Sequence, residues 1–244
     1  MISKKRQFAN DKQTLATFVV GKANEKTVKV VQEWMTDKMK NRKLFIYGDS
    51  GNGKTHLANA VYKQMLGQGV HVRMRDVDSF TKELIGWLRV GGTVEEYYKN
   101  YSELTDVLII DDIRSFERTP AAAGYCKELV KRFVKEKKKI LLTTDSKTAI
   151  YRWPGGLFAR KIQIKKPDKK LKVDILRKYA ATRNFYVPED ILLLVSEIDA
   201  NMAELTATLH EVLVYSKILG EKLDGKLIER IWEKRMSQKR REKR

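Results

Sequence analysis

The sequence contains one pattern with a well-defined chemistry, Gly48-Asp49-Ser50-Gly51-Asn52-Gly53-Lys54-Thr55, which matches the phosphate-binding pattern G-x-x-x-x-G-K-[ST]. Glycines let backbone N–H groups turn toward a phosphate, and the N-terminus of a following helix favours an anion at the same place. We expect Lys54 to reach the β- and γ-phosphates of a nucleotide and Thr55 to ligate Mg²⁺. The pattern therefore predicts a site for ATP and magnesium.

Two neighbouring carboxylates, Asp111 and Asp112, form a second candidate group. They follow the continuous apolar run 107–110, which is typical of a central strand buried on both faces. We expect Asp111 to hold the metal through water and Asp112 to orient or deprotonate the attacking water. Asp145, at another polar strand end after Thr143 and Thr144, is a candidate sensor of the γ-phosphate.

A sheet whose strands alternate with helices is expected to position these residues. Short apolar runs predict strands at 44–47, 70–75, 107–111, 140–144 and 161–164. Longer amphipathic stretches predict helices at 55–66, 79–89, 94–101 and 121–137. This alternation predicts an α/β fold with a five-stranded parallel sheet and helices on both faces.

A small all-α lid subdomain is expected after Pro167, where the strand signals stop. Helices are predicted at 168–183, from Pro188, from Asn201 to Gly220, and from Asp224 onward. The expected regions are therefore an N-terminal extension, an α/β nucleotide-binding subdomain, a helical lid and a basic C-terminal tail, at 1–13, 14–167, 168–233 and 234–244. Because the tail has almost no apolar residue, we expect it to be mobile or frayed.

Composition narrows the class of protein. The chain has 244 residues, 50 Lys and Arg against 31 Asp and Glu, and a net charge of +19. Such an excess suits a polyanionic partner, and nucleic acid is the commonest one. A single cysteine, no secretory signal, no long apolar run and no zinc-spaced Cys/His cluster predict a cytoplasmic protein without a membrane partner.

Several motifs together carry a family resemblance: Phe18-Val-Val-Gly-Lys-Ala-Asn24, the apolar strand and P-loop ending in Gly53-Lys-Thr-His-Leu57, and Asp106-Val-Leu-Ile-Ile-Asp-Asp-Ile113. They are similar to the AAA+ ATPases of the bacterial replication initiator DnaA and helicase loader DnaC clade. The resemblance implies a P-loop AAA+ domain followed by the helical lid. It also implies that the 18–24 stretch lies against the adenine, so that the expected nucleotide contacts include Phe18, Val20, Gly21, Asn24 and His56.

The resemblance also implies how ATP is hydrolysed. Arg160 matches the position of the family's arginine finger, which reaches the ATP of a neighbouring subunit, and Arg152 is the rival candidate. Ala203 stands where the family has its second sensor arginine. A cation near the γ-phosphate is then missing, and we expect an ATPase with slow turnover.

A stretch between the second and third predicted strands is the candidate surface for single-stranded DNA. In the DnaA-like clade this region carries an extra helix that faces the central channel of the assembly. We expect the basic residues Lys82, Arg89 and Lys99 to contact the DNA backbone. The tyrosines at 97, 98 and 101 are expected either to stack on bases or to pack in the core.

The resulting hypothesis is an ATP-binding replication protein that assembles on single-stranded DNA and helps recruit or load a replicative helicase. Assembly would join copies of this chain, or this chain and a related AAA+ protein, in an ATP-dependent manner. The alternatives are a regulatory adaptor that acts on an initiator ATPase and an IstB-type transposition ATPase. The double-stranded DNA-reading domain and the N-terminal helicase-binding region of initiators have no counterpart in the sequence, so a complete origin-recognising initiator is not expected, and the basic tail is the preferred helicase contact.

Overall fold

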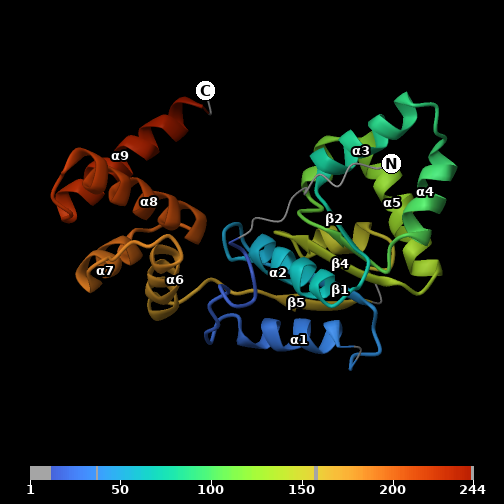
Figure 1. Cartoon of the computed structure of the whole chain (residues 1–244), viewed down its shortest axis with the longest axis horizontal. Coiled ribbons are helices and arrows are strands. Elements are labelled where there is room, and N and C mark those ends of the chain that lie inside the picture. Colours follow the sequence, from blue (N-terminus) through green and yellow to red (C-terminus); the bar gives the residue numbers. More distant parts are fainter. Residues whose placement is uncertain (1–11, 37, 157–158, 243–244) are drawn as a thin grey trace. The chain divides into compact units, whose positions relative to one another are not determined.

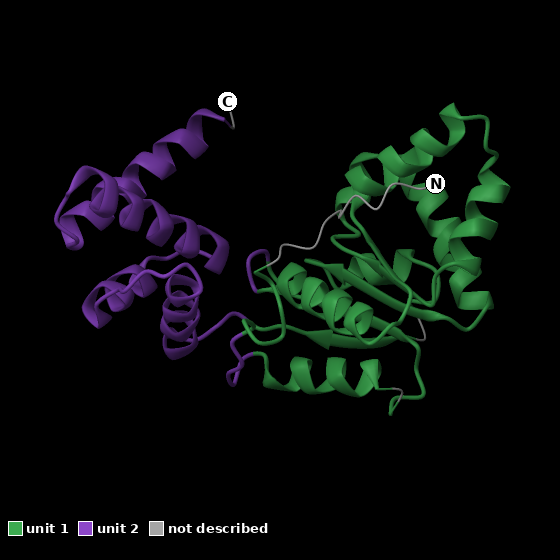
Figure 2. Ribbon diagram, in the orientation of Figure 1, with its two compact units in different colours: residues 1–18, 24–49, 53–165 green, residues 19–23, 50–52, 166–244 purple. Residues whose placement is uncertain are grey.

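The structure is a computed structural model that describes residues 12–36, 38–156 and 159–242. The chain forms two compact units (Figure 2). Unit 1 comprises residues 1–18, 24–49 and 53–165, and unit 2 comprises residues 19–23, 50–52 and 166–244. Residues 1–11 of the expected N-terminal extension lie outside the described residues.

Unit 1 is built on a five-stranded sheet in the order β2-β3-β4-β1-β5 (Figure 1). The strands are β1 (Lys43–Tyr47), β2 (Val72–Arg75), β3 (Val107–Ile110), β4 (Lys139–Thr144) and β5 (Arg160–Gln163). All neighbouring strands pair in parallel, with Tyr47 of β1 opposite Thr144 of β4. The expected five-stranded parallel α/β fold is confirmed. The carboxyl ends of all five strands lie on the same side of the sheet, which is where such sheets usually bind ligands.

Helices cover both faces of this sheet (Figure 1). They are α1 (Glu25–Met35), α2 (Lys54–Gly67), α3 (Val77–Arg89), α4 (Val94–Glu103) and α5 (Pro120–Lys135), with short 3₁₀ helices at Ser115–Arg118 and Thr148–Arg152. Successive strand residues point to opposite faces, so Leu44 and Ile46 pack with α1 and α2, whereas Phe45 packs in the cluster that holds α3, α4 and α5. Burial on both faces explains why β3 and the central residues of β1 and β4 are apolar.

The tyrosines of α4 belong to the core. Tyr97, Tyr98 and Tyr101 are 3%, 6% and 1% exposed and pack with Phe80 and Phe133. The expectation that they stack on DNA bases is therefore wrong. At spacings of one, three and four residues the three rings share one helix face, and that face packs against α3 and α5.

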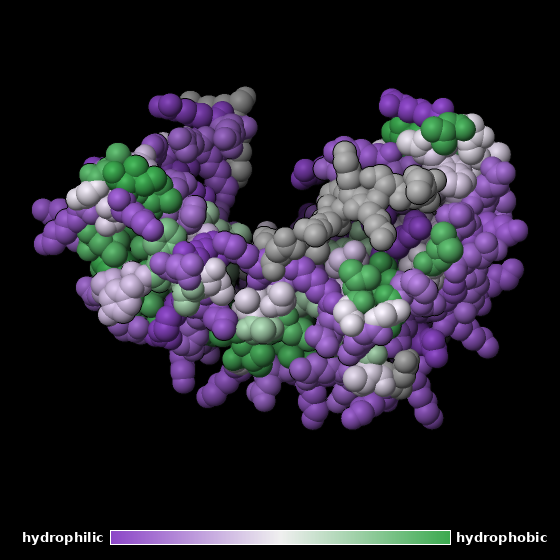
Figure 3. Space-filling model, in the orientation of Figure 1, coloured by the Kyte–Doolittle hydropathy of each residue, from purple (hydrophilic) through white to green (hydrophobic). Residues whose placement is uncertain are grey.

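Unit 2 contains the helices α6 (Lys169–Ala181), α7 (Glu189–Glu197), α8 (Met202–Leu219) and α9 (Gly225–Arg241). Side-chain caps begin three of them: Asp168, Asn201 and Asp224 each accept a hydrogen bond from the backbone N–H three residues later. Leu176, Leu205, Leu209 and Ile231 are among the residues that form the apolar core of this unit. Hydrophilic side chains dominate the visible face of each unit in Figure 3.

Helix α9 continues into the segment that we expected to be a mobile tail. It extends to Arg241, and three of its cations contact α8. Lys234 donates to the Tyr215 hydroxyl at 2.7 Å, while Arg235 pairs with Glu211 and Lys239 with Glu204. The expectation of a frayed tail is wrong for residues 234–241, because partners on α8 order a segment that has little apolar surface. Residues 243 and 244 lie outside the described part.

Within the described residues, no helix combines the length and the apolar character needed to cross a membrane.

Candidate nucleotide-binding site

The P-loop follows β1 at the carboxyl edge of the sheet and leads directly into α2. Three of its glycines have backbone conformations that side chains rarely adopt: Gly48 has φ 152°, Gly51 has φ 81° and Gly53 has φ 97°. A Cβ on Gly48 would lie 2.3 Å from the Ile164 carbonyl oxygen, so no other residue fits there without movement. Gly53 is the residue before α2, and the free N–H groups of that helix N-terminus form a favourable place for an anion.

Lys54 folds back over this loop. The residue is only 9% exposed, and its ammonium group donates to the Gly48 carbonyl at 2.7 Å and to the Asp49 carbonyl at 3.0 Å. Desolvation by burial lowers the pKa of Lys54, and the nearby carboxylates of Asp145, Asp111 and Asp112 partly oppose this shift. A positive charge is thus held at the P-loop by neutral carbonyl partners. Ser50, Gly51 and Asn52, the central residues of the loop, belong to unit 2.

Thr143 connects the two acidic residues that follow β3. Its hydroxyl donates to Asp111 Oδ1 at 2.5 Å and accepts from the Asp112 N–H at 2.8 Å. Thr55, at the start of α2, donates to Asp111 Oδ2 at 2.8 Å. The structure therefore joins the P-loop helix, β3 and β4 through the Asp111 carboxylate, which is only 8% exposed. The sequence indicated a polar strand end at Thr143 without indicating this linking role.

The carboxylates of Asp112 and Asp145 lie at the same end of the strands as Asp111. Burial is the largest cause that raises the pKa of Asp111 and of Asp112, and the Asp111 and Asp145 charges raise the pKa of Asp112 further. Asp145 accepts a hydrogen bond from Arg114 at 2.8 Å, whereas its Oδ1 is buried without a hydrogen-bond partner among the described residues. Sequence reasoning did not identify Arg114, although it stands two residues after the acidic pair.

The 18–24 stretch is divided between the units. Phe18 is 8% exposed, and its ring meets that of His56 edge-on with centroids 5.1 Å apart. His56 also contacts the Thr14 carbonyl, and burial lowers the pKa of its imidazole. Asn24 is buried directly before α1, whereas Val20 is 51% exposed. Gly21 lies in unit 2, where a Cβ would be 2.9 Å from Leu171 of α6.

Arg160 is not part of this group. It is exposed at the first position of β5, opposite Leu44 of β1, so it lies at the amino end of the strands while the P-loop lies at the carboxyl end. Its rival Arg152 pairs with Glu117 at 3.3 Å. Among the described residues, Arg160 has no carboxylate within 4 Å. Leu157 and Phe158, which belong to the same motif, lie outside the described residues.

The expected DNA contacts lie on another part of unit 1. Lys82 and Arg89 are exposed on α3, and Lys99 is exposed on α4. All three side chains are therefore available to a partner in this structure. The neighbouring aromatic residues of α4 are not, because they are buried.

Comparison with known proteins gives the family of this chain. A family model described as the bacterial DnaA ATPase domain matches residues 9–151. The chromosomal replication initiator protein DnaA of Enterococcus faecalis is 31% identical over an aligned length of 233 residues, and the match covers 91% of this chain and 52% of that protein. The chain spans about half the length of the curated relatives that it matches.

Solved structures share the fold. Domain III of the Thermotoga maritima replication initiation protein DnaA superposes with a TM-score of 0.81 at 23% identity, covering 92% of this chain and 97% of that one. A replication initiator DnaA bound to AMPPCP and single-stranded DNA gives a TM-score of 0.71 at 23% identity, covering 97% of this chain and 71% of that one. With the family model matching more than half of the sequence, this chain belongs to the bacterial DnaA ATPase domain family.

Proposed function

We propose that this chain binds ATP at the P-loop and hydrolyses it slowly. The observation that carries the proposal is the hydrogen-bonded group of Lys54, Thr55, Asp111 and Thr143, which gathers the P-loop and the acidic strand end at one edge of the sheet. A DnaA solved with AMPPCP, an ATP analogue, supports ATP as the nucleotide. Lys54 would exchange its carbonyl partners for phosphate oxygens, which match a buried ammonium group better because they are charged.

A magnesium ion fits the same residues. Mg²⁺ keeps several waters and is usually held by one or two carboxylates together with substrate phosphates. Among the described residues there is no cluster of three or more histidines, cysteines or acids that would hold a metal alone. The hydroxyl of Thr55 is the expected direct ligand, and the carboxylate of Asp111 would hold the ion through water. The ion would neutralise charge on the phosphates.

Turnover would depend on a second molecule. Asp112 is the proposed residue that orients or deprotonates water, and Asp145 is the proposed γ-phosphate sensor. Arg160 lies at the other edge of the sheet from the P-loop of its own chain, so it would serve a neighbouring subunit. Ala203, exposed at the start of α8, supplies no cation at the position of the second sensor arginine. Slow basal hydrolysis that rises on self-association follows from these two features.

The proposed role is to assemble on single-stranded DNA and help recruit or load a replicative helicase. The exposed cations Lys82, Arg89 and Lys99 support a DNA surface, and a DnaA solved with single-stranded DNA supports this ligand. An adaptor that stimulates the ATP hydrolysis of a related initiator is the second candidate. The exposed Arg160 favours it, because an arginine at the opposite end of the strands from its own P-loop is suited to act on another ATPase.

Calorimetric titration with ATP and Mg²⁺ tests the proposed site. Lys54→Ala should abolish tight binding, whereas Lys29→Ala, which removes an exposed lysine of α1, should bind ATP like the wild type. Unchanged affinity in Lys54→Ala contradicts the site. Mixing the chain with a related initiator then separates the two roles: stimulation of that initiator that disappears with Arg160→Ala selects the adaptor.

A further inference from the structure

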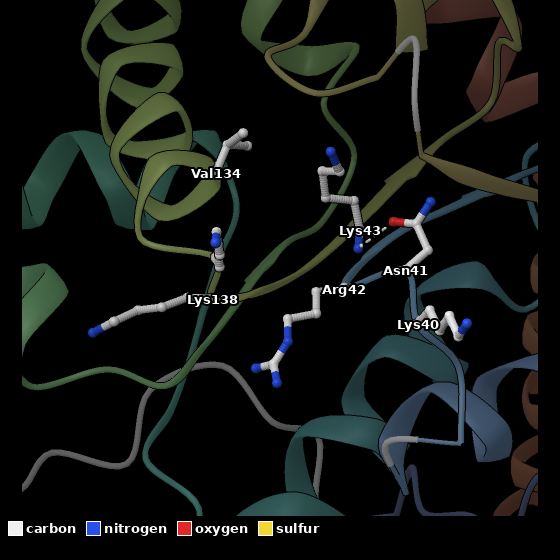
Figure 4. A pocket seen from close by; sticks show the side chains of 7 residues that line it. Lys40, Asn41, Arg42, Lys43, Val134 and Lys138 are labelled. Atoms are coloured by element: carbon white, nitrogen blue, oxygen red, sulfur yellow. Dashed lines mark hydrogen bonds between the residues drawn. The ribbon is translucent and has the colours of Figure 1, made fainter.

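A cationic groove lies at the opposite end of β1 from the P-loop. Figure 4 shows side chains that line it. It has a volume of about 450 Å³, and its lining residues come from the segment that leads into β1 and from the end of α5: Lys40, Asn41, Arg42, Lys43, Val134, Lys137 and Lys138. Lys43 is the first residue of β1, and Gly48 of the P-loop follows the last. At about 3.3 Å per strand residue, roughly 16 Å of strand separates the two sites, so the groove is distinct from the nucleotide site.

The charges of this groove are largely uncompensated. Lys138 has an acidic neighbour, Glu136 at 3.5 Å, and also donates to the carbonyls of Ser102 and Thr105. Among the residues that the structure describes, the side chains of Lys40, Arg42, Lys43 and Lys137 have no carboxylate within 4 Å. Four like charges in one groove repel one another, and an anion bound there would relieve this repulsion.

The backbone that carries Arg42 is firmly held. The Arg42 carbonyl accepts hydrogen bonds from Trp34 Nε1 at 3.1 Å and from the Ile140 N–H at 2.9 Å. The Lys43 N–H donates to Asn41 Oδ1 at 3.0 Å, the contact drawn in Figure 4. The cationic side chains therefore project from a fixed segment, which reduces the entropy cost when they bind a ligand.

Lys137 occupies a backbone conformation that usually requires glycine. Helix α5 ends with hydrogen bonds from the Lys137 N–H to the Val134 carbonyl and from the Lys138 N–H to the Phe133 carbonyl. This helix ending places Lys137 at φ 56°, in the left-handed region, where glycine is the common residue. A lysine there costs conformational energy that the fold does not need, since the same turn forms with glycine. This strain points to a use for the Lys137 charge.

We propose that this groove binds the phosphodiester backbone of DNA, as a contact separate from the α3–α4 surface. Among the described residues that line this groove, five carry a cationic side chain, one carries an amide and Val134 is apolar. Arg42 offers a planar fork and the lysines offer point charges, which are the two usual partners of phosphate. A free polyphosphate shares this chemistry, and DNA is favoured by the net charge of +19.

The test is the double variant Arg42→Gln/Lys137→Gly in the full chain, with Lys29→Gln/Lys222→Gln as a control that removes the same charge from exposed positions elsewhere. Fluorescence anisotropy with a labelled 20-nucleotide strand and with a 20-base-pair duplex is measured over a salt series. Removing two phosphate-binding cations lowers the slope of log affinity against log salt by about 1.4 for the single strand and about 1.8 for the duplex. At 0.1 M salt the single-strand affinity falls about 25-fold on the same relation.

Further measurements identify why the DNA affinity of the double variant changes. The double variant and its control are also made in a chain that carries Lys82→Gln, Arg89→Gln and Lys99→Gln. If the groove acts independently of the α3–α4 surface, Arg42→Gln/Lys137→Gly must still lower the DNA affinity and the salt slope in that chain. The melting temperature of Lys137→Gly must not fall below that of the wild type, which excludes misfolding as the cause. A salt slope equal to that of the control overturns the proposal. Binding of tripolyphosphate or of polyglutamate to the wild-type chain is measured as well. If either ligand binds and the DNA affinity is unchanged in the double variant, the proposal is overturned. Tripolyphosphate binding would then favour a free polyphosphate, and polyglutamate binding would favour an acidic protein.

Discussion

Arg114 Nη1 donates a hydrogen bond to Asp145 Oδ2 at 2.8 Å, which ties the segment after β3 to the segment after β4 at the edge that carries the P-loop. The Arg114 charge also opposes the rise in the pKa of Asp112 that burial and the neighbouring carboxylates produce. This arginine is therefore placed to favour the charged form of Asp112 in the candidate site. The side chain of Arg114 is 56% exposed, so its contribution to folding stability is small.

Replacing Arg114 separates its effect on the pKa of Asp112 from its effect on folding stability. In Arg114→Ala the pKa of Asp112 should rise further, because the variant lacks a cation that favours the charged form of this carboxyl. The acidic limb of the ATP hydrolysis profile should then move to higher pH, while the free energy of unfolding changes by less than about 0.5 kcal/mol. Arg118→Ala, which removes an exposed arginine at the end of the 3₁₀ helix that follows Arg114, is the control. Superimposable pH profiles for the two variants would show that Arg114 does not act on the site.

Asp111 should destabilise the metal-free fold at neutral pH. Burial raises its pKa above the ordinary value of 3.8, despite hydrogen bonds from Thr143 and Thr55. The native state then binds more protons than the unfolded state between the two pKa values, so stability falls as the pH rises through that window. Each unit by which the pKa is raised corresponds to about 1.4 kcal/mol.

Thermal unfolding of Asp111→Asn, measured with a metal chelator present, tests whether the Asp111 charge destabilises the fold. The variant should melt above the wild type at pH 7, because an amide keeps both hydroxyl partners without a buried charge. The difference should disappear below the ordinary pKa of 3.8, where the wild-type carboxyl is protonated in both states. Tm values that are lower for Asp111→Asn at every pH would mean that the hydrogen bonds outweigh the burial of the charge.

DNA binding by α3 and α4 should depend on charge and not on aromatic stacking. Replacing Lys82, Arg89 and Lys99 by glutamine should weaken single-stranded DNA binding and flatten its salt dependence, by about 0.7 in slope for each phosphate-binding cation removed. Tyr98→Phe is the contrasting variant, because its ring is buried and the substitution removes only the hydrogen bond from its hydroxyl to the Tyr125 carbonyl. A steep fall in affinity in Tyr98→Phe with none in the triple variant would reverse this assignment.

The parts of the molecule that the sequence predicted are those that local patterns determine. The P-loop, its flanking strand and helix, and the capped helices of unit 2 are encoded within a few neighbouring residues, such as Asn201 and Glu204, whose side chains bond each other's backbone. Helix α1 was not predicted, although Val28, Val31 and Trp34 recur at helical spacing and are buried. The pairing of Arg114 with Asp145 joins residues 31 positions apart, and no local pattern indicates it.

The end of α9 gives the last prediction, because its order depends on distant partners. Lys239 pairs with Glu204 of α8, and this contact is the largest cause that lowers the pKa of Glu204. A carboxyl whose folded pKa is lowered adds stability above its unfolded pKa of about 4.5, and that stability is lost as the pH falls through the folded value. Removing residues 237–244 should therefore lower the free energy of unfolding at pH 7 by up to about 1 kcal/mol. ATP affinity should be unchanged, because the proposed nucleotide contacts do not include this segment.

Thermal unfolding of the truncated chain at two pH values decides whether α9 is ordered in solution as the structure has it. We expect a decrease in Tm of up to about 4 °C at pH 7, which is the shift that corresponds to 1 kcal/mol in a chain of this size. The decrease should shrink at low pH, because Glu204 takes up a proton there and its pairing with Lys239 is lost. Lys239→Ala alone should reproduce most of the effect at pH 7, and Lys226→Ala, at the exposed start of the same helix, should not. A truncated chain that melts with the full chain at both pH values would mean that residues 237–244 fray, as their composition alone suggests.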